Sequence, residues 1–172
     1  MEHAAVPGDV RAQRLSAWIE AYSEAILRTC FVYLADRQLA EDAMQDTFLK
    51  AWKAMPQYEK SGVGQDKAWL MRIAINTCKD YRRGQWFRHV DIRSSLEDLP
   101  PRLLAVEMED RTMTLSIAGL PDRLKQVILL YYYQNLTMRE TAQALGVSPS
   151  TVMKRLAKAE ALLKGSLTGG EE

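Results

Sequence analysis

The chain has 172 residues, 47% of them hydrophobic and 26% charged, and its formal net charge is +1 at pH 7. This length suits one domain or two small ones, and the apolar fraction can bury a core, which excludes wholesale disorder. The longest apolar run, Val127–Tyr133, is too short for a membrane span, which needs roughly 18 residues. Residues 1–14 contain no apolar segment of a secretory signal. Cys30 and Cys78 have no zinc-binding spacing, so we expect free thiols and no metal.

Charge alternates along the chain although the total is close to zero. Residues 20–59 and 94–118 each carry a net charge of −3, whereas residues 66–93 and 120–164 each carry +4. Basic segments suit a polyanion, and acidic segments suit a protein partner or a solvated linker. Charge alone leaves open that all four segments are ordinary solvent-facing helix surfaces.

Two amphipathic helices are predicted first. Apolar residues recur at steps of three and four over residues 10–35, which is the stripe of a helix that packs on one side. Asp36 is expected to cap a second helix over residues 37–54. Pro56 is expected to end that helix, and residues 57–65 are predicted as a loop.

A third helix is predicted from Asp66, as its cap, to Arg83. Trp69 belongs to its apolar stripe, so a core role is favoured over a role as an exposed stacking platform. The opposite side of this helix is polar and mostly basic. It carries Arg72, Asn76, Lys79, Arg82 and Arg83.

Helical periodicity breaks over residues 94–102, which contain two consecutive prolines and form the predicted domain boundary. A helix over residues 103–118 is predicted to follow. Pro121 then suits a first helical position, because its missing N–H group costs nothing there. The helix that it opens is predicted to run to Gln134.

Two short helices joined by a tight turn are predicted next. Thr137 and Glu140 have the spacing of a capping box, and Gly146 suits the left-handed residue that ends a helix. Ser148 and Pro149 then suit the N-cap and first turn of a second helix. This is the pattern of a helix-turn-helix, whose second helix enters the DNA major groove. The predicted outward set can contact phosphates or base edges: Ser150, Thr151, Lys154, Arg155 and Lys158.

The order of these motifs resembles a known family. Residues 40–52 (AEDAMQDTFLKAW) resemble the core-binding motif of region 2 of bacterial RNA polymerase sigma factors. Residues 69–83 resemble the WLxxIAxN…D…RR helix of the same region, and residues 120–163 resemble region 4. The short length and the absence of an extra domain between these regions are typical of the extracytoplasmic function (ECF) group.

The resemblance implies an all-α fold with two small helical domains: region 2 over 1–93 and region 4 over 111–172, joined by an acidic linker over 94–110. It implies a cytoplasmic transcription initiation factor that is not an enzyme and needs no cofactor. The expected partners are promoter DNA and core RNA polymerase, through the clamp helices of its largest subunit and its flap. An anti-sigma factor, often membrane-bound in this family, is also expected.

The resemblance also assigns site residues. Core polymerase would be bound by Asp42, Gln45, Asp46 and Leu49. The −10 element, read as an opened strand, would be bound by Lys60 and Ser61 of the predicted loop and by Asn76, Lys79, Arg82 and Arg83. The −35 element would be bound as duplex by Ser148, Ser150, Thr151, Lys154, Arg155 and Lys158. Trp86 and Phe87 are expected to be exposed, without an assigned role.

The recognition helix departs from the common family pattern GTVKSRLxRAR. Met153 stands in place of a basic residue and Lys154 in place of a small one. Lys158 and Glu160 stand in place of arginines. Because lysine is a point charge and arginine a bidentate fork, the −35 contacts are expected to differ from the common pattern.

Three alternatives remain open at this point. A helix-turn-helix regulator would bind DNA without polymerase, but it has no need for the motifs at 41–52 and 69–83. An enzyme is disfavoured because His3 and His89 have no metal-ligand spacing, and no GxSxG or P-loop motif is present. A helical adaptor would bind no nucleic acid even with core polymerase.

Overall fold

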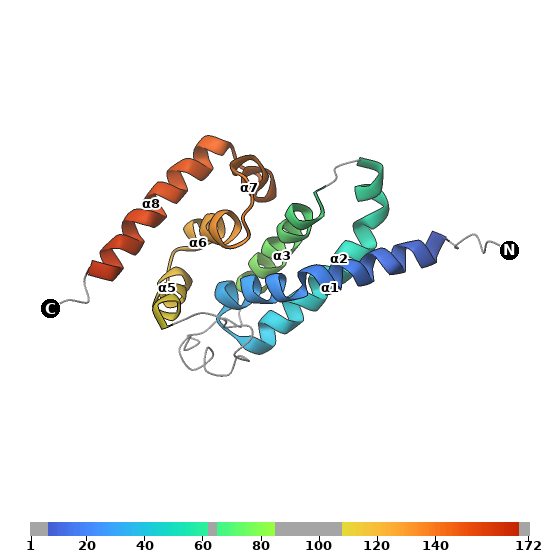
Figure 1. The fold of residues 1–172 in the computed structure, drawn as a ribbon, viewed down its shortest axis with the longest axis horizontal. Helices are drawn as coiled ribbons and strands as arrows, with labels where there is room; N and C mark the ends of the chain where they lie inside the picture. The colour runs from blue at the N-terminus through green and yellow to red at the C-terminus, as the bar shows by residue number, and fades with distance from the viewer. Residues whose placement is uncertain (1–6, 62–64, 85–107, 169–172) are drawn as a thin grey trace.

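The computed structural model describes residues 7–61, 65–84 and 108–168, and every element within these ranges is helical. The predicted all-α class is therefore confirmed. In the N-terminal part, α1 (Pro7–Leu34), α2 (Arg37–Ser61) and α3 (Asp66–Arg83) pack against one another (Figure 1). The C-terminal part consists of α5 (Met108–Ala118), α6 (Asp122–Ile128), η1 (Leu129–Tyr133), α7 (Met138–Leu145) and α8 (Pro149–Thr168).

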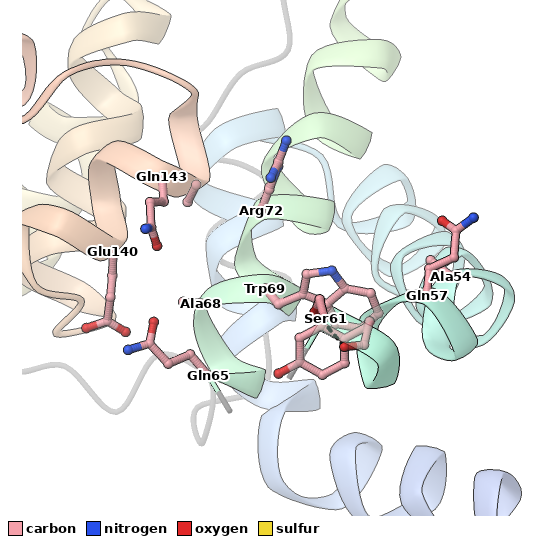
Figure 2. Close-up of a pocket in the computed structure, with 11 residues that line it drawn as sticks. Ala54, Gln57, Ser61, Gln65, Ala68, Trp69, Arg72, Glu140 and Gln143 are labelled. Atoms are coloured by element: carbon pink, nitrogen blue, oxygen red, sulfur yellow. Dashed lines mark hydrogen bonds between the residues drawn. The ribbon is translucent and has the colours of Figure 1, made fainter. Parts of the chain in front are cut away.

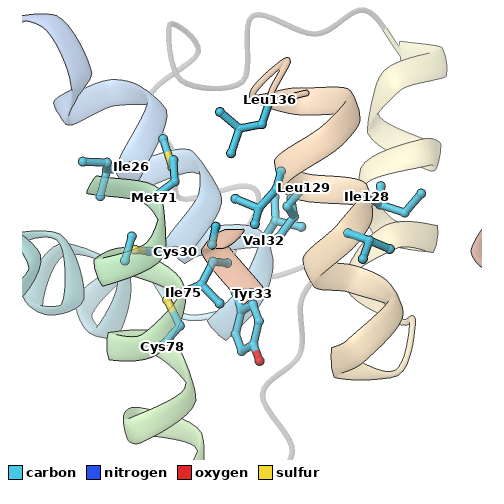
Figure 3. Packing of buried hydrophobic residues seen from close by; sticks show 14 of the residues in the cluster. Ile26, Cys30, Val32, Tyr33, Met71, Ile75, Cys78, Ile128, Leu129 and Leu136 are labelled. Atoms are coloured by element: carbon cyan, nitrogen blue, oxygen red, sulfur yellow. The ribbon is translucent and has the colours of Figure 1, made fainter. Parts of the chain in front are cut away.

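The three N-terminal helices enclose a core of large apolar side chains. Ile26 and Leu34 of α1 and Leu70 and Ile75 of α3 are fully buried. Cys30 and Cys78 are free thiols in the same cluster (Figure 3). Their mutual hydrogen bond and their burial raise the pKa of Cys78 well above its ordinary value, so this thiol stays protonated and unreactive.

Asp66 ties all three N-terminal helices together. Its carboxylate accepts hydrogen bonds from Trp18 Nε1 at 3.0 Å and from the Tyr58 hydroxyl, and it lies 3.3 Å from the guanidinium of Arg14. Burial opposes its ionisation, but these hydrogen bonds and the Arg14 charge hold its pKa below the ordinary value. The prediction that Asp66 caps α3 is wrong, because Gln65 occupies the N-cap and the carboxylate is engaged by α1 and α2 instead.

Pro56 lies inside α2, so the predictions that it ends this helix and that a loop follows directly are wrong. A helical proline leaves the carbonyl four residues earlier without its N–H partner. Here that carbonyl, Trp52 O, accepts a hydrogen bond from Arg11 of α1 at 3.0 Å, and the Arg11 guanidinium lies over the Trp52 ring. The next turn also buries Met55 and Tyr58. These contacts compensate for the lost hydrogen bond.

In the C-terminal part, the helix expected from Pro121 to Gln134 begins and ends differently. Pro121 is the N-cap, and Asp122 is the first helical residue. From Leu129 to Tyr133 the chain forms a π-helical turn, in which the Gln134 N–H bonds the Leu129 carbonyl at 3.0 Å. The helix predicted over 103–118 is observed from Met108, while residues 103–107 lie outside the described ranges.

Candidate nucleic-acid and polymerase interface

The helix-turn-helix forms as its capping residues predict. Both hydrogen bonds of the Thr137–Glu140 capping box are present at 3.1 Å, and Gly146 adopts a left-handed φ of 66°. Ser148 Oγ accepts from the Thr151 N–H at 3.2 Å, and Pro149 is the first residue of α8. These local bonds fix the angle between α7 and α8 before any long-range contact is considered.

The candidate −35 residues divide by exposure. Val152, Leu156 and Ala159 are buried and define the inner side of α8. The side chains that face solvent are Ser148, Ser150, Lys154 and Lys158, whereas Thr151 and Arg155 are half-buried. The outward side of α8 is thus basic, and its two lysines, Lys154 and Lys158, are exposed to solvent.

The candidate −10 residues on α3 differ from those on α8, because some of them already contact the C-terminal helices. Asn76 and Arg83 are exposed. Arg82 forms an ion pair with Asp122 of α6 at 3.2 Å and donates to the Tyr33 carbonyl at 3.2 Å. Burial, followed by the charges of Arg83 and Arg155, lowers the pKa of Lys79. The basic side of α3 therefore already contacts the C-terminal helices.

Lys60 and Ser61 are exposed but belong to the last turn of α2 rather than to a loop. Ser61 Oγ donates to the Tyr58 carbonyl at 2.6 Å. Trp69 stacks on the Tyr58 ring, with centroids 4.1 Å apart and planes 16° apart. The predicted packing role of Trp69 agrees with this contact. Residues 62–64, residues 94–107 of the predicted linker 94–110, and Trp86 and Phe87 lie outside the described ranges, while residues 108–110 belong to α5.

The candidate polymerase surface lies on α2. Leu49 is 58% exposed, and Gln45 is also exposed. Asp42 is half-buried and accepts from Gln38 Nε2 at 3.2 Å. The Asp46 carboxylate accepts from the Tyr81 hydroxyl of α3, and burial and this hydrogen bond raise the pKa of Tyr81. The four candidate residues therefore lie together along α2, with Gln45 and Leu49 exposed and the two carboxylates held by neighbouring side chains.

Sequence reasoning missed the contact between the two halves of the chain. Tyr33 of α1 is buried, and its hydroxyl accepts from Gln126 Nε2 of α6 at 3.0 Å. Lys125, only 2% exposed, places its ammonium 5.3 Å from the Tyr33 ring centroid. Burial and the Arg82 charge lower the pKa of Lys125 to about 8. Gln134 adds hydrogen bonds to Thr29 and to the Ala25 carbonyl.

Two clefts border this contact. One, of about 520 Å³, is lined by Lys79, Arg82 and Arg83 of α3 together with Arg123 and Arg155. The second, of about 570 Å³, lies between the Trp69 region and α7. Figure 2 shows Glu140 and Gln143 of α7 on one side of it, and Trp69 and Arg72 of α3 on the other. In the first cleft, residues from both candidate DNA surfaces lie together: Lys79, Arg82 and Arg83 of the −10 set and Arg155 of the −35 set.

Comparisons with known proteins decide the family. Residues 18–88 match sigma-70 region 2, and residues 111–163 match sigma-70 region 4. The ECF RNA polymerase sigma factor SigM of Bacillus subtilis is 27% identical over 160 residues, covering 88% of this chain and 93% of SigM. The chain belongs to the ECF group of RNA polymerase sigma factors.

Two further matches, one in sequence and one in fold, are also to sigma factors. The probable sigma factor RfaY of Xanthomonas campestris is 26% identical over 160 residues, which cover 87% of this sigma factor and 39% of RfaY. The fold is similar to that of the sigma factor RpoE of Bartonella quintana, solved with the anti-sigma factor NepR. That similarity has a TM-score of 0.72 at 19% identity, and it covers 92% of this chain and 99% of the other.

The sigma factor is accordingly a transcription initiation factor that directs RNA polymerase to promoters, and it is not an enzyme. Its partners are core RNA polymerase and promoter DNA. None of the helices that the structure describes is long and apolar enough to cross a membrane. Within the described ranges, no three His, Cys, Asp or Glu side chains gather in a way that could hold a metal ion.

Proposed function

We propose that this sigma factor divides promoter recognition between α3 and α8, while α2 holds core polymerase. The α2 surface consists of Asp42, Gln45, Asp46 and Leu49. The −10 surface consists of Lys60, Ser61, Asn76, Lys79, Arg82 and Arg83. The −35 surface consists of Ser148, Ser150, Thr151, Lys154, Arg155 and Lys158. The domain boundaries proposed with this division are 1–93, 94–110 and 111–172.

One observation carries the −35 assignment. The capped turn at Gly146 and Ser148 fixes α8 so that its N-terminal half presents Ser150, Lys154 and Lys158 to solvent. The N-terminal end of a recognition helix is the part that reaches base edges in the major groove. Lysine and serine can contact guanine or phosphate from that position.

The proposal requires the two halves to separate. Their names place the −10 and −35 elements about 25 base pairs apart, which is roughly 85 Å along B-form DNA. In the structure, Lys79 of α3 and Arg155 of α8 line the same cleft. One duplex cannot present both elements to surfaces that close together. The proposal therefore requires core polymerase to hold the halves farther apart than they lie in this structure.

An anti-sigma factor is proposed as a further partner. The support is that the structurally similar RpoE of Bartonella quintana was solved in complex with the anti-sigma factor NepR. Because core RNA polymerase is found in the cytoplasm, this sigma factor is proposed to act there.

Reconstitution with core polymerase tests the proposed function. The complex is expected to start transcription at a defined set of promoters, mapped by transcript 5′ ends across the source genome. The free chain is expected to bind duplexes containing those upstream elements only weakly. Tight, sequence-specific duplex binding without polymerase would instead indicate a helix-turn-helix regulator.

A further inference from the structure

Met153 is an apolar side chain on the solvent-facing part of α8. It is 60% exposed, the highest value among the large apolar side chains in the part of the chain that the structure describes. An isolated exposed leucine or valine is common on protein surfaces. Met153, however, lies in the second turn of the helix that carries the candidate −35 residues, so its surroundings matter.

The helix geometry directs Met153 to the edge of the outward side. Successive residues of an α-helix are about 100° apart, which places Met153 about 100° from buried Val152 and from exposed Lys154. Its neighbours three and four residues away are Pro149, Ser150, Leu156 and Ala157. Leu156 is buried on the inner side, and the other three are exposed and short, so the thioether projects beyond them.

Intramolecular packing does not account for this side chain. Arg155 is the α8 residue that lines the basic cleft against α3, and Met153 lines neither of the two clefts described above. The other exposed large apolar residue of α8 in the described part of the chain is Leu162, on the opposite flank of the helix at about 180°. A single apolar side chain between Ser150 and Lys154 is smaller than an apolar docking patch for a protein.

We propose that Met153 recognises a thymine in the −35 element by contact with its C5-methyl group. This inference rests on the proposed role of α8 as the −35 reader. Among the four bases, only thymine presents a methyl group in the major groove, and apolar side chains are its usual contacts. Methionine has no hydrogen-bonding hydrogen and an unbranched, flexible chain, so it adapts to a methyl group but gains nothing at a cytosine amine.

The experiment begins by selecting −35 elements from a randomised upstream duplex with the reconstituted holoenzyme. The wild-type chain is compared with Met153→Ala and with Leu162→Ala, a matched control on the opposite flank of α8. We expect one position at which the wild type and the control select thymine and Met153→Ala does not. Circular dichroism and thermal unfolding establish that the variants fold, and co-purification establishes that they bind core polymerase.

The second step removes only the methyl group. At the selected position, thymine is replaced by deoxyuridine in an otherwise identical duplex. Wild-type holoenzyme should lose about fourfold in affinity, the effect of burying one methyl-sized group. Met153→Ala should bind both duplexes equally, at the affinity that the wild type shows for deoxyuridine. Met153→Lys should also ignore the methyl group and increase the salt dependence by about one phosphate contact.

The outcomes separate this inference from the proposed function. Equal wild-type binding of thymine and deoxyuridine at every position of the element overturns the inference. Undiminished methyl discrimination by Met153→Ala overturns it too. If Lys154→Ala and Lys158→Ala still weaken binding to the same duplexes, the proposed −35 role of α8 survives that result. If these lysine variants also bind normally, the proposed role itself is wrong.

Discussion

The two basic helices α3 and α8 differ in what covers them. On α8, Lys154 and Lys158 are exposed, and the helix is fixed by its own caps. On α3, Arg82 is paired with Asp122 of α6, and Lys79 lines a cleft shared with Arg155. By this comparison, the surface proposed to read duplex DNA is already exposed in this structure. The surface proposed to read the opened strand is partly engaged by the rest of the molecule.

The engagement is of a kind that can be released. The contact between the halves is apolar in part, because Leu129 and Leu136 belong to the same buried cluster as Val32 (Figure 3). It also buries polar and charged groups, namely Lys125, Gln126 and the Tyr33 hydroxyl. Burying an ammonium is costly unless it is well paired, and here desolvation lowers its pKa. Contacts between domains of one chain permit relative motion unless the interface is large and hydrophobic, and the buried polar groups weaken this one. A partner that binds α2 and the C-terminal half separately can therefore pull them apart.

The largest expected effect is the loss of core polymerase binding, because polymerase is the partner proposed to free α3 from the C-terminal half. Leu49→Arg places a charge in the proposed polymerase surface, and we expect at least a tenfold loss of affinity for core polymerase, as for a central interface residue. Val10→Arg is the control, because Val10 is a similarly exposed apolar residue on α1. Affinities from titration of core polymerase with a labelled chain measure the effect. Equal affinities of the two variants would contradict the assignment of this surface.

A smaller effect is expected from pH, through Lys125. In the closed arrangement, in which the two halves are in contact as in this structure, burial disfavours the charged form and the pKa of Lys125 is about 8. An exposed lysine has a pKa of about 10.4. Between these values the closed arrangement binds fewer protons, so raising the pH from 8 towards 10 stabilises it relative to the separated one. Burial raises the pKa of the facing Tyr33 to about 12, so this phenol stays neutral across the window.

Small-angle scattering of the free chain measures this dependence. The radius of gyration should fall as the pH rises from 8 to 10, and Lys125→Met should reduce the change. The remainder is expected from Lys79, whose pKa is also lowered at this contact. A radius that stays constant or increases in the wild type would show that Lys125 does not control the contact between the halves.

The smallest effect is expected from the ion pair between α3 and α6. Asp122→Asn removes the charge that faces Arg82 at 3.2 Å, and both side chains of this pair are more than one-third exposed. The same carboxylate lies 4.0 Å from the ammonium of buried Lys125, so the experiment is run at pH 10, where Lys125 is neutral in the closed arrangement. Exposed pairs contribute about 0–1 kcal/mol, so the separated population should increase by no more than about fivefold. Arg37→Gln, which removes an exposed pair within α2, is the control. Distances between fluorophores placed on the two halves measure the populations. A closed population unaffected by Asp122→Asn would show that this ion pair does not stabilise the contact between the halves.

Local signals predicted the helix-turn-helix well. The Thr137–Glu140 box, Gly146 and Ser148 act over three or four residues, so their bonds could be inferred from spacing alone. Asp36 likewise accepts from the Leu39 N–H at 2.9 Å, as expected of a cap. Such caps are determined by nearby residues and do not depend on the tertiary fold.

The errors arose where distant residues decide the outcome. Pro56 remains helical because Arg11, 45 positions earlier, bonds the carbonyl that proline leaves unpaired. The Asp66 carboxylate accepts hydrogen bonds from Trp18 and Tyr58 instead of capping its own helix. The Tyr33–Gln126 contact joins positions 93 residues apart, and no periodicity or motif in the sequence indicates such a pair.

The division of labour between α3 and α8 is tested most directly by permanganate reactivity of promoter thymines in the holoenzyme complex, measured beside binding to an upstream duplex. Asn76→Ala is expected to leave duplex binding unchanged and to lower thymine reactivity around −10. Lys154→Ala and Lys158→Ala are expected to weaken duplex binding, by about 1–3 kcal/mol if the side chain contacts a base. Normal strand opening by Asn76→Ala, or lysine variants that impair only opening, would contradict this division.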